Sequence, residues 1–118
     1  MKKPIIAVVL ILLICDYGYC GFVVSGTDLL DACLGYTGSL KTNSANDGYC
    51  VGYILGSHDG VSIESRAIDK DFICPPDGVK SSQLALIVKK YLQVHPETLH
   101  LPASKLVGLS LIEAFPCK

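Results

Sequence analysis

Apolar residues recur every three or four positions along much of the chain, which is the spacing of helices with one buried face. A first helix is expected after Ser25, because Asp28 three residues later completes the pattern of a capping box. Gly35 is expected to end this helix, since glycine readily follows the last turn of a helix. The polar residues 36–46 that come next predict a loop.

Two further helices are expected in the second half of the chain. Ser81 or Ser82 can cap the first of them, and Pro96 interrupts its apolar pattern. Pro102 is suited to the first position of the next helix, where a backbone N–H would have no partner inside the helix. The expected inner faces consist of Leu84, Ile87, Val88, Tyr91 and Val94, and of Ala103, Leu106, Val107, Ser110, Leu111 and Ala114.

Glycine recurs every fourth residue before these helices, at Gly48, Gly52, Gly56 and Gly60. The segment lacks the alternation of a strand, and as a helix it places the four glycines along one side. Each glycine costs about 1 kcal/mol relative to alanine inside a helix, so the close approach of another helix is expected to compensate. We expect that helix to belong to the same chain, because a small domain must first cover its own core; a partner or dimer helix is the alternative. The mixed-charge residues 60–71 then predict a loop.

The beginning of the chain has the pattern of an export signal. Lys2 and Lys3 precede an unbroken apolar run at residues 5–14, which is too short to span a bilayer. Residues 1–20 therefore predict a signal peptide, and residues 21–118 predict a single exported mature domain.

The exact processing of this segment leaves two alternatives. Cleavage after Cys20 is favoured, because Gly18 and Cys20 are small residues at the positions that such cleavage needs. A lipid anchor on Cys15 or Cys20 is the weaker alternative, since Ile14 stands where processing before Cys15 requires a small residue.

Charge and composition exclude one class of partner. Without the expected signal peptide the chain carries eight basic and ten acidic residues, a net charge of −2. No basic patch points to nucleic acid. The full chain is 50% hydrophobic, and enough apolar residues remain for a compact core.

Four cysteines remain in the expected mature domain: Cys33, Cys50, Cys74 and Cys117. An even number in a small exported chain predicts two disulfides, and the lack of C-x-x-C spacing makes a metal site the weaker alternative. In a roughly antiparallel four-helix domain, the end of helix one lies near the start of helix two. The start of helix three likewise lies near the end of helix four. We therefore predict the pairs Cys33–Cys50 and Cys74–Cys117 in an all-α, disulfide-stapled fold.

Residues with catalytic potential do not form a recognisable active site. His58 and Asp59 are adjacent, and adjacent residues on a helix point in different directions. His95 and His100 are five residues apart, which is not the i, i+4 spacing of a zinc-binding helix. Neither a hydrolase nucleophile motif nor a phosphate-binding glycine loop is present. The sequence predicts a protein that binds another protein and has no metal, cofactor, small-molecule substrate or enzymatic activity.

The order of motifs along the mature chain resembles the Rap/Tai family of immunity proteins, which are linked to bacterial type VI secretion. The matching motifs are residues 26–30 with Cys33, 50–54 with Gly56 and Asp59, 72–75, 91–92, 95–97, 99–100, 102–103 and 114–117. Each motif alone is common, and the ordered set carries the resemblance.

The resemblance implies a small helical periplasmic protein with two disulfides, often a homodimer. Characterised members bind a toxin injected by neighbouring cells, a peptidoglycan amidase with a cysteine–histidine active site, and block its substrate groove. The alternative is a periplasmic chaperone or stress-binding module without a dedicated toxin, because a scaffold does not fix its partner.

The resemblance does not identify contact residues, since the contact loops of the family vary. We expect the polar stretch of residues 58–71 to contact the partner, because it is the longest mixed-charge connection beside the glycine-rich helix; an ordinary solvated loop is the alternative. The candidate contact residues are His58, Asp59, Glu64, Arg66 and Asp69.

Overall fold

Helices are the regular elements of residues 24–40 and 44–118, the parts of the chain that the computed structural model describes. The elements are α2 (Gly26–Cys33), α3 (Ala45–Ile68), α4 (Ser81–Val94), the short 3-10 helix η2 (Pro96–Thr98) and α5 (Ala103–Ala114). The expected all-α fold of four helices is confirmed. The expected signal peptide at residues 1–20, with Cys15 and Cys20, lies outside the described residues.

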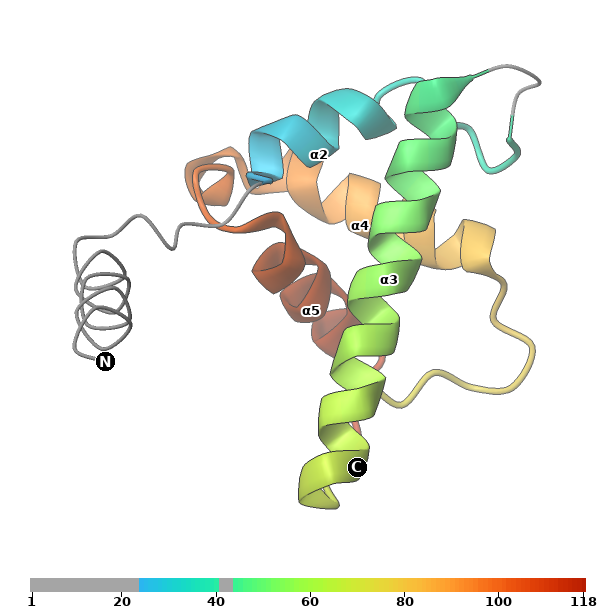
Figure 1. Ribbon diagram of the computed structural model, residues 1–118, viewed down its shortest axis with the longest axis vertical. Coiled ribbons are helices and arrows are strands. Elements are labelled where there is room, and N and C mark those ends of the chain that lie inside the picture. The colour runs from blue at the N-terminus through green and yellow to red at the C-terminus, as the bar shows by residue number, and fades with distance from the viewer. Residues whose placement is uncertain (1–23, 41–43) are drawn as a thin grey trace, which may run out of the picture.

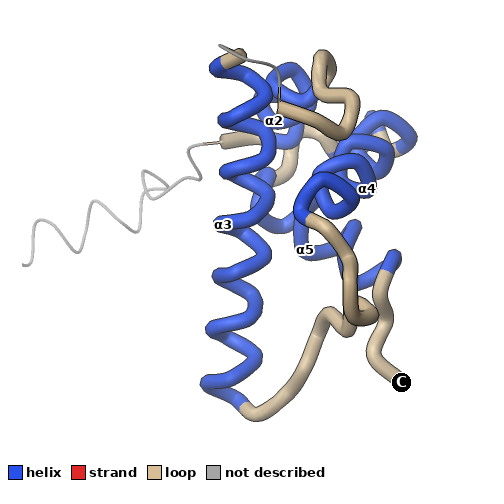
Figure 2. The backbone as a smooth tube through the Cα atoms, turned by 90° about the vertical axis from the view of Figure 1, so that its right-hand side faces the viewer, coloured by secondary structure: helices blue, strands red, loops and turns tan. Residues whose placement is uncertain are grey.

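α3 is the longest helix, and α2, α4 and α5 all pack against it. It extends beyond the other helices at its C-terminal end, as Figures 1 and 2 show. We call the part of the molecule around α2 and the start of α3 the proximal end, and the part around the end of α3 the distal end.

The start of α2 follows the sequence closely. Ser25 and Asp28 form the expected capping box, in which the Ser25 N–H and hydroxyl both donate to the Asp28 carboxylate, at 2.9 and 2.6 Å. Gly26 is buried where α2 meets the turn before α5, and its N–H donates to the Leu101 carbonyl at 3.0 Å. A Cβ on Gly26 would overlap the side chain of Leu106 and lie 2.9 Å from the Leu99 carbonyl oxygen, so this position requires glycine.

α3 is longer than the sequence indicated at both ends. It begins at Ala45, where the Ser44 hydroxyl accepts the Asp47 N–H at 3.1 Å, and it continues to Ile68. The loop expected over residues 60–71 is therefore wrong as far as Ile68. Asp69 ends the helix in the left-handed conformation, with a φ of 53°, and its N–H bonds to the Ser65 carbonyl.

α4 and α5 match their expected extents with one small shift each. The N-cap of α4 is Lys80, not Ser81 or Ser82, because the Gln83 side chain reaches back to accept the Lys80 N–H at 2.9 Å. Pro102 is the N-cap of α5 and so stands one position earlier than expected.

The core lies where the four helices meet. Cys33, Cys50, Ile54, Leu92 and Leu106 are among the fully buried side chains. The complete set of buried apolar residues is Leu29, Cys33, Tyr36, Cys50, Ile54, Leu84, Ala85, Val88, Leu92, Ala103, Leu106, Val107 and Leu111.

Lys89 adds a polar link within this packing. Its ammonium group donates to the carbonyls of Leu34 and Tyr36, at 2.7 and 2.9 Å. These carbonyls follow the end of α2, where backbone acceptors lack partners within the helix and a positive charge is favourable. Lys89 therefore fixes the end of α2 to α4.

Both predicted disulfides are present. Cys33–Cys50 joins the end of α2 to the first part of α3, and Cys74–Cys117 joins the connection between α3 and α4 to the end of the chain. The Cys74 N–H also donates to the Phe115 carbonyl at 2.9 Å, so a hydrogen bond reinforces the second link.

Candidate functional site

Four of the five candidate contact residues lie on the last turns of α3, and Asp69 caps that helix. Asp59, Glu64 and Arg66 are exposed, whereas only 22% of the His58 side chain is exposed. A helix turns by about 100° per residue, so Asp59 and Arg66, seven positions apart, share one edge of α3 and Glu64 lies at the opposite edge. Asp59 and Arg66 therefore lie on the same side of α3, about two turns apart, and Glu64 lies on a different side.

His58 contacts its neighbour Asp59 directly. Nδ1 of His58 lies 3.5 Å from Oδ1 of Asp59, and the Ser62 hydroxyl donates to the His58 carbonyl at 3.0 Å. The expectation that these two side chains point apart is wrong, because the imidazole is long enough to reach the exposed carboxylate beside it. The cysteines of the described residues are all in disulfides, so none of them is a free thiol that could act as a nucleophile with this pair.

The four regularly spaced glycines lie on the exposed side of α3. An added Cβ would meet nothing within 4 Å at Gly48, Gly52, Gly56 or Gly60. The expectation that a helix of the same chain packs against them is therefore wrong. The buried side of α3 is instead formed by Asp47, Cys50, Ile54 and Ser65.

Apolar side chains accompany these exposed glycines. Tyr49 and Tyr53 stack with their ring centroids 6.0 Å apart, and 46% of Tyr49 is exposed. Ile63 is 68% exposed farther along the same side. We call this surface the glycine face, and it consists of Gly48, Tyr49, Gly52, Tyr53, Gly56, Gly60 and Ile63.

The glycine face is flanked by charge at its distal part. Asp59 and Arg66 lie along one edge and Glu64 along the other, so a partner that covers the face meets an acidic and a basic group on one side and an acidic group on the other. Four glycines together lower the helix propensity of α3 by roughly 3–4 kcal/mol relative to alanine. Packing within the described part of the chain does not offset this loss, because these glycines face open space.

Metal-binding and membrane-spanning features are absent from the described ranges 24–40 and 44–118. No group of three or more histidine, cysteine and acidic side chains in these ranges could hold a metal ion. No helix in these ranges is long and apolar enough to cross a membrane.

The arrangement defines a class of protein: a small helical scaffold, closed by two disulfides, that presents one long helix at its surface. Residues 25–117 match the family model of the Rap1a immunity proteins, and the chain belongs to this family. The match extends from the residue that caps α2 to the last cysteine of the second disulfide. No curated protein and no solved structure matches the chain.

Proposed function

We propose that this chain is a periplasmic immunity protein that binds a peptidoglycan amidase toxin delivered by type VI secretion and sterically blocks its substrate groove. The observation that carries the proposal is membership of the Rap1a immunity proteins over residues 25–117. The export pattern of residues 1–20 supports action in the periplasm, where such a toxin meets the cell wall.

The proposal assigns inhibition to binding and not to catalysis. The described cysteines are all in disulfides, so none supplies a thiolate nucleophile. Binding alone can inhibit a hydrolase, because a bound protein can exclude the substrate from the active site.

The proposed contact surface is the distal half of α3, with its candidate residues His58, Asp59, Glu64, Arg66 and Asp69. This part of the helix extends beyond the other helices and leaves Asp59, Glu64 and Arg66 exposed (Figure 2). The adjoining glycine face supports the assignment, because another backbone can approach a helix closely at positions occupied by glycine.

The test of the function is a binding and inhibition assay with the amidase encoded beside the gene for this chain. The mature protein is titrated into the amidase by calorimetry, and hydrolysis of purified peptidoglycan is followed. We expect a stoichiometric complex and loss of hydrolysis. An amidase that stays active and unbound would contradict the proposal, and suppression of aggregation of unrelated client proteins would favour a chaperone instead.

Charge reversal on α3 tests the contact surface. Glu64→Lys and Arg66→Glu are each expected to weaken toxin binding by roughly tenfold if their edge is contacted, because like charges across an interface repel. The two residues lie at opposite edges of the helix, so the single variants show which edge the toxin covers. Matched controls are Asp31→Lys and Lys105→Glu, exposed positions on α2 and α5. Unchanged affinity in both α3 variants, with the fold intact by circular dichroism, would exclude this surface.

The oligomeric state is a separate part of the proposal. The resemblance to dimeric members predicts a homodimer of the mature chain. Sedimentation equilibrium measures the mass directly, and a monomer across the concentrations used for toxin binding would contradict this part alone.

A further inference from the structure

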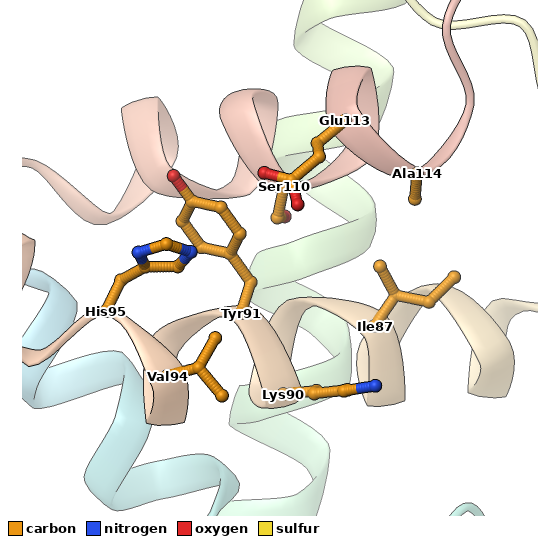
Figure 3. A pocket seen from close by; sticks show the side chains of 8 residues that line it. All are labelled: Ile87, Lys90, Tyr91, Val94, His95, Ser110, Glu113 and Ala114. Carbon is orange, nitrogen blue, oxygen red and sulfur yellow. The ribbon is translucent and has the colours of Figure 1, made fainter.

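A pocket of about 280 Å³ lies between α4 and α5, and none of the candidate contact residues of α3 lines it (Figure 3). Ile87, Val94 and Ala114 give it apolar walls, and Ser110 lies at its base, where its hydroxyl donates to the Val107 carbonyl at 2.8 Å. The remaining lining residues are Lys90, Tyr91, His95 and Glu113.

The charged groups of the pocket are separated. Glu113 comes from α5 and points toward the region of Tyr91 and Ser110, whereas the Lys90 side chain extends along the opposite wall, beside Ile87 (Figure 3). The ion pairs of residues 24–40 and 44–118 are His58–Asp59 and His95–Glu97, so Lys90 and Glu113 do not neutralise each other.

A second carboxylate stands next to the same end of the pocket. Glu97 Oε1 lies 3.1 Å from His95 Nδ1. The pKa of Glu97 is lowered by the hydrogen bond from its own backbone N–H and then by that from His95, so Glu97 is ionised at neutral pH. Glu113 in the lining and Glu97 beside His95 place two carboxylates near the end of the pocket formed by Tyr91 and His95, and the Lys90 side chain extends away from it, so this end is acidic (Figure 3).

Aromatic rings form the wall at this acidic end. The rings of Tyr91 and His95 are 4.4 Å apart and tilted by 38°, and both residues line the pocket. A cation is attracted to the face of such a ring, and a guanidinium group also stacks on it. A carboxylate beside an aromatic face is therefore a setting suited to arginine.

The pocket is small and open to solvent. Its volume of about 280 Å³ is at the lower limit of the roughly 300–1,000 Å³ of pockets that enclose small molecules, and a single side chain can occupy such a space. We propose that the pocket receives a basic side chain, an arginine, from the protein partner. This proposal rests on the proposed function only in taking the partner to be the toxin.

The first test needs no toxin. The probe is N-acetyl-arginine-methylamide, and N-acetyl-glutamate-methylamide is its matched acidic counterpart; both are titrated into the mature protein and followed by amide NMR. We expect saturable shifts at Tyr91, His95, Ser110 and Glu113 with the arginine probe and none with the glutamate probe. Equal responses to both probes, or no response to the arginine probe, would overturn the proposal.

The second test compares how two substitutions that each remove one charge change the affinity for the toxin. Glu113→Gln should weaken toxin binding by roughly tenfold, as expected for a contact residue that meets a charge. Lys90→Gln should leave binding unchanged or strengthen it, because it removes a repulsive ammonium group. Asp31→Asn and Lys105→Gln are the matched controls. Toxin affinity that rises or stays unchanged with Glu113→Gln, or falls with Lys90→Gln, would overturn the proposal. A wild-type protein that fails to bind the toxin would instead refute the proposed function, and the probe titration alone would then test whether the pocket binds arginine.

Discussion

Cys33 and Cys50 are completely buried at the proximal end, whereas Cys74 and Cys117 are exposed at the distal end. The first pair lies inside the core, among residues that would pack together without a covalent bond. The second pair joins two irregular segments that contact the core through partly buried residues such as Ile73 and Phe115, while the two cysteines themselves stay exposed. The proximal end is thus held by burial, and the distal end depends more on its covalent link.

This difference separates stability from the proposed binding surface. Gly26 at the proximal end is enclosed by Leu106 and Leu99, whereas Gly52 and Gly56 on α3 face open space. Glycine allows close packing within the chain at Gly26, and it leaves the backbone of α3 accessible at Gly52 and Gly56. Three predictions test whether this contrast holds.

The disulfides should give the largest effect. Removing either pair by double alanine substitution should lower the free energy of unfolding by roughly 3–4 kcal/mol in the chain-entropy model, given loops of 17 and 43 residues. Under mild dithiol treatment of the wild type, Cys74–Cys117 should be reduced first, because the attacking thiolate can reach it without local unfolding. Alkylation followed by peptide mass mapping measures the order, and earlier modification of Cys33 and Cys50 would break the comparison.

Replacing glycine with alanine should change the free energy of unfolding in opposite directions at the enclosed Gly26 and at the exposed Gly52. Gly26→Ala should destabilise the protein by about 1–3 kcal/mol, because the new methyl group overpacks against Leu106 and the Leu99 carbonyl. Gly52→Ala should stabilise it by up to about 1 kcal/mol through helix propensity. Urea unfolding measures both changes. If Gly52→Ala also weakens toxin binding, the glycine face is a contact surface; a destabilised Gly52→Ala would mean that α3 is already covered.

The capping box of α2 should give the smallest effect, and one that depends on pH. Hydrogen bonds from Ser25 hold the pKa of Asp28 below its usual value of 3.8. A carboxylate with a lowered pKa in the folded state stabilises the fold above its unfolded pKa, and this contribution is lost as the pH falls through the folded pKa. Asp28→Asn should therefore be less stable than wild type at neutral pH and equal to it in strong acid. A difference that persists unchanged in acid, by urea unfolding across the pH range, would exclude this origin.

Much of the fold could be predicted because local chemistry and global topology agree. Ser25 and Asp28 indicated where α2 begins, and the order of the four helices placed each cysteine beside its partner. The length of α3 could not be predicted, since residues 61–68 mix charged and apolar side chains without a clear buried stripe. The long helix is ended by Asp69 in a left-handed conformation, which asparagine and aspartate adopt more readily than most residues but do not require.

The candidate site was harder to predict than the fold. A four-residue period shows that the glycines share one side of a helix, but it does not show whether that side faces the core. The direction depends on which other residues are buried, here Cys50 and Ile54, and this is a property of the tertiary packing. The pocket between α4 and α5 gave no signal either, because Tyr91 and Glu113 are far apart in the sequence and meet only when the two helices pack.

The pairing of consecutive cysteines has a consequence for how the protein would be made. In a chain exported N-terminus first, Cys33 and Cys50 emerge before the other two and can be oxidised together. Cys74 then finds Cys33 and Cys50 occupied and pairs with Cys117, which emerges 43 residues later. Oxidation in the order of emergence thus yields the native bonds without isomerisation, and the second bond closes only after α4 and α5 have emerged.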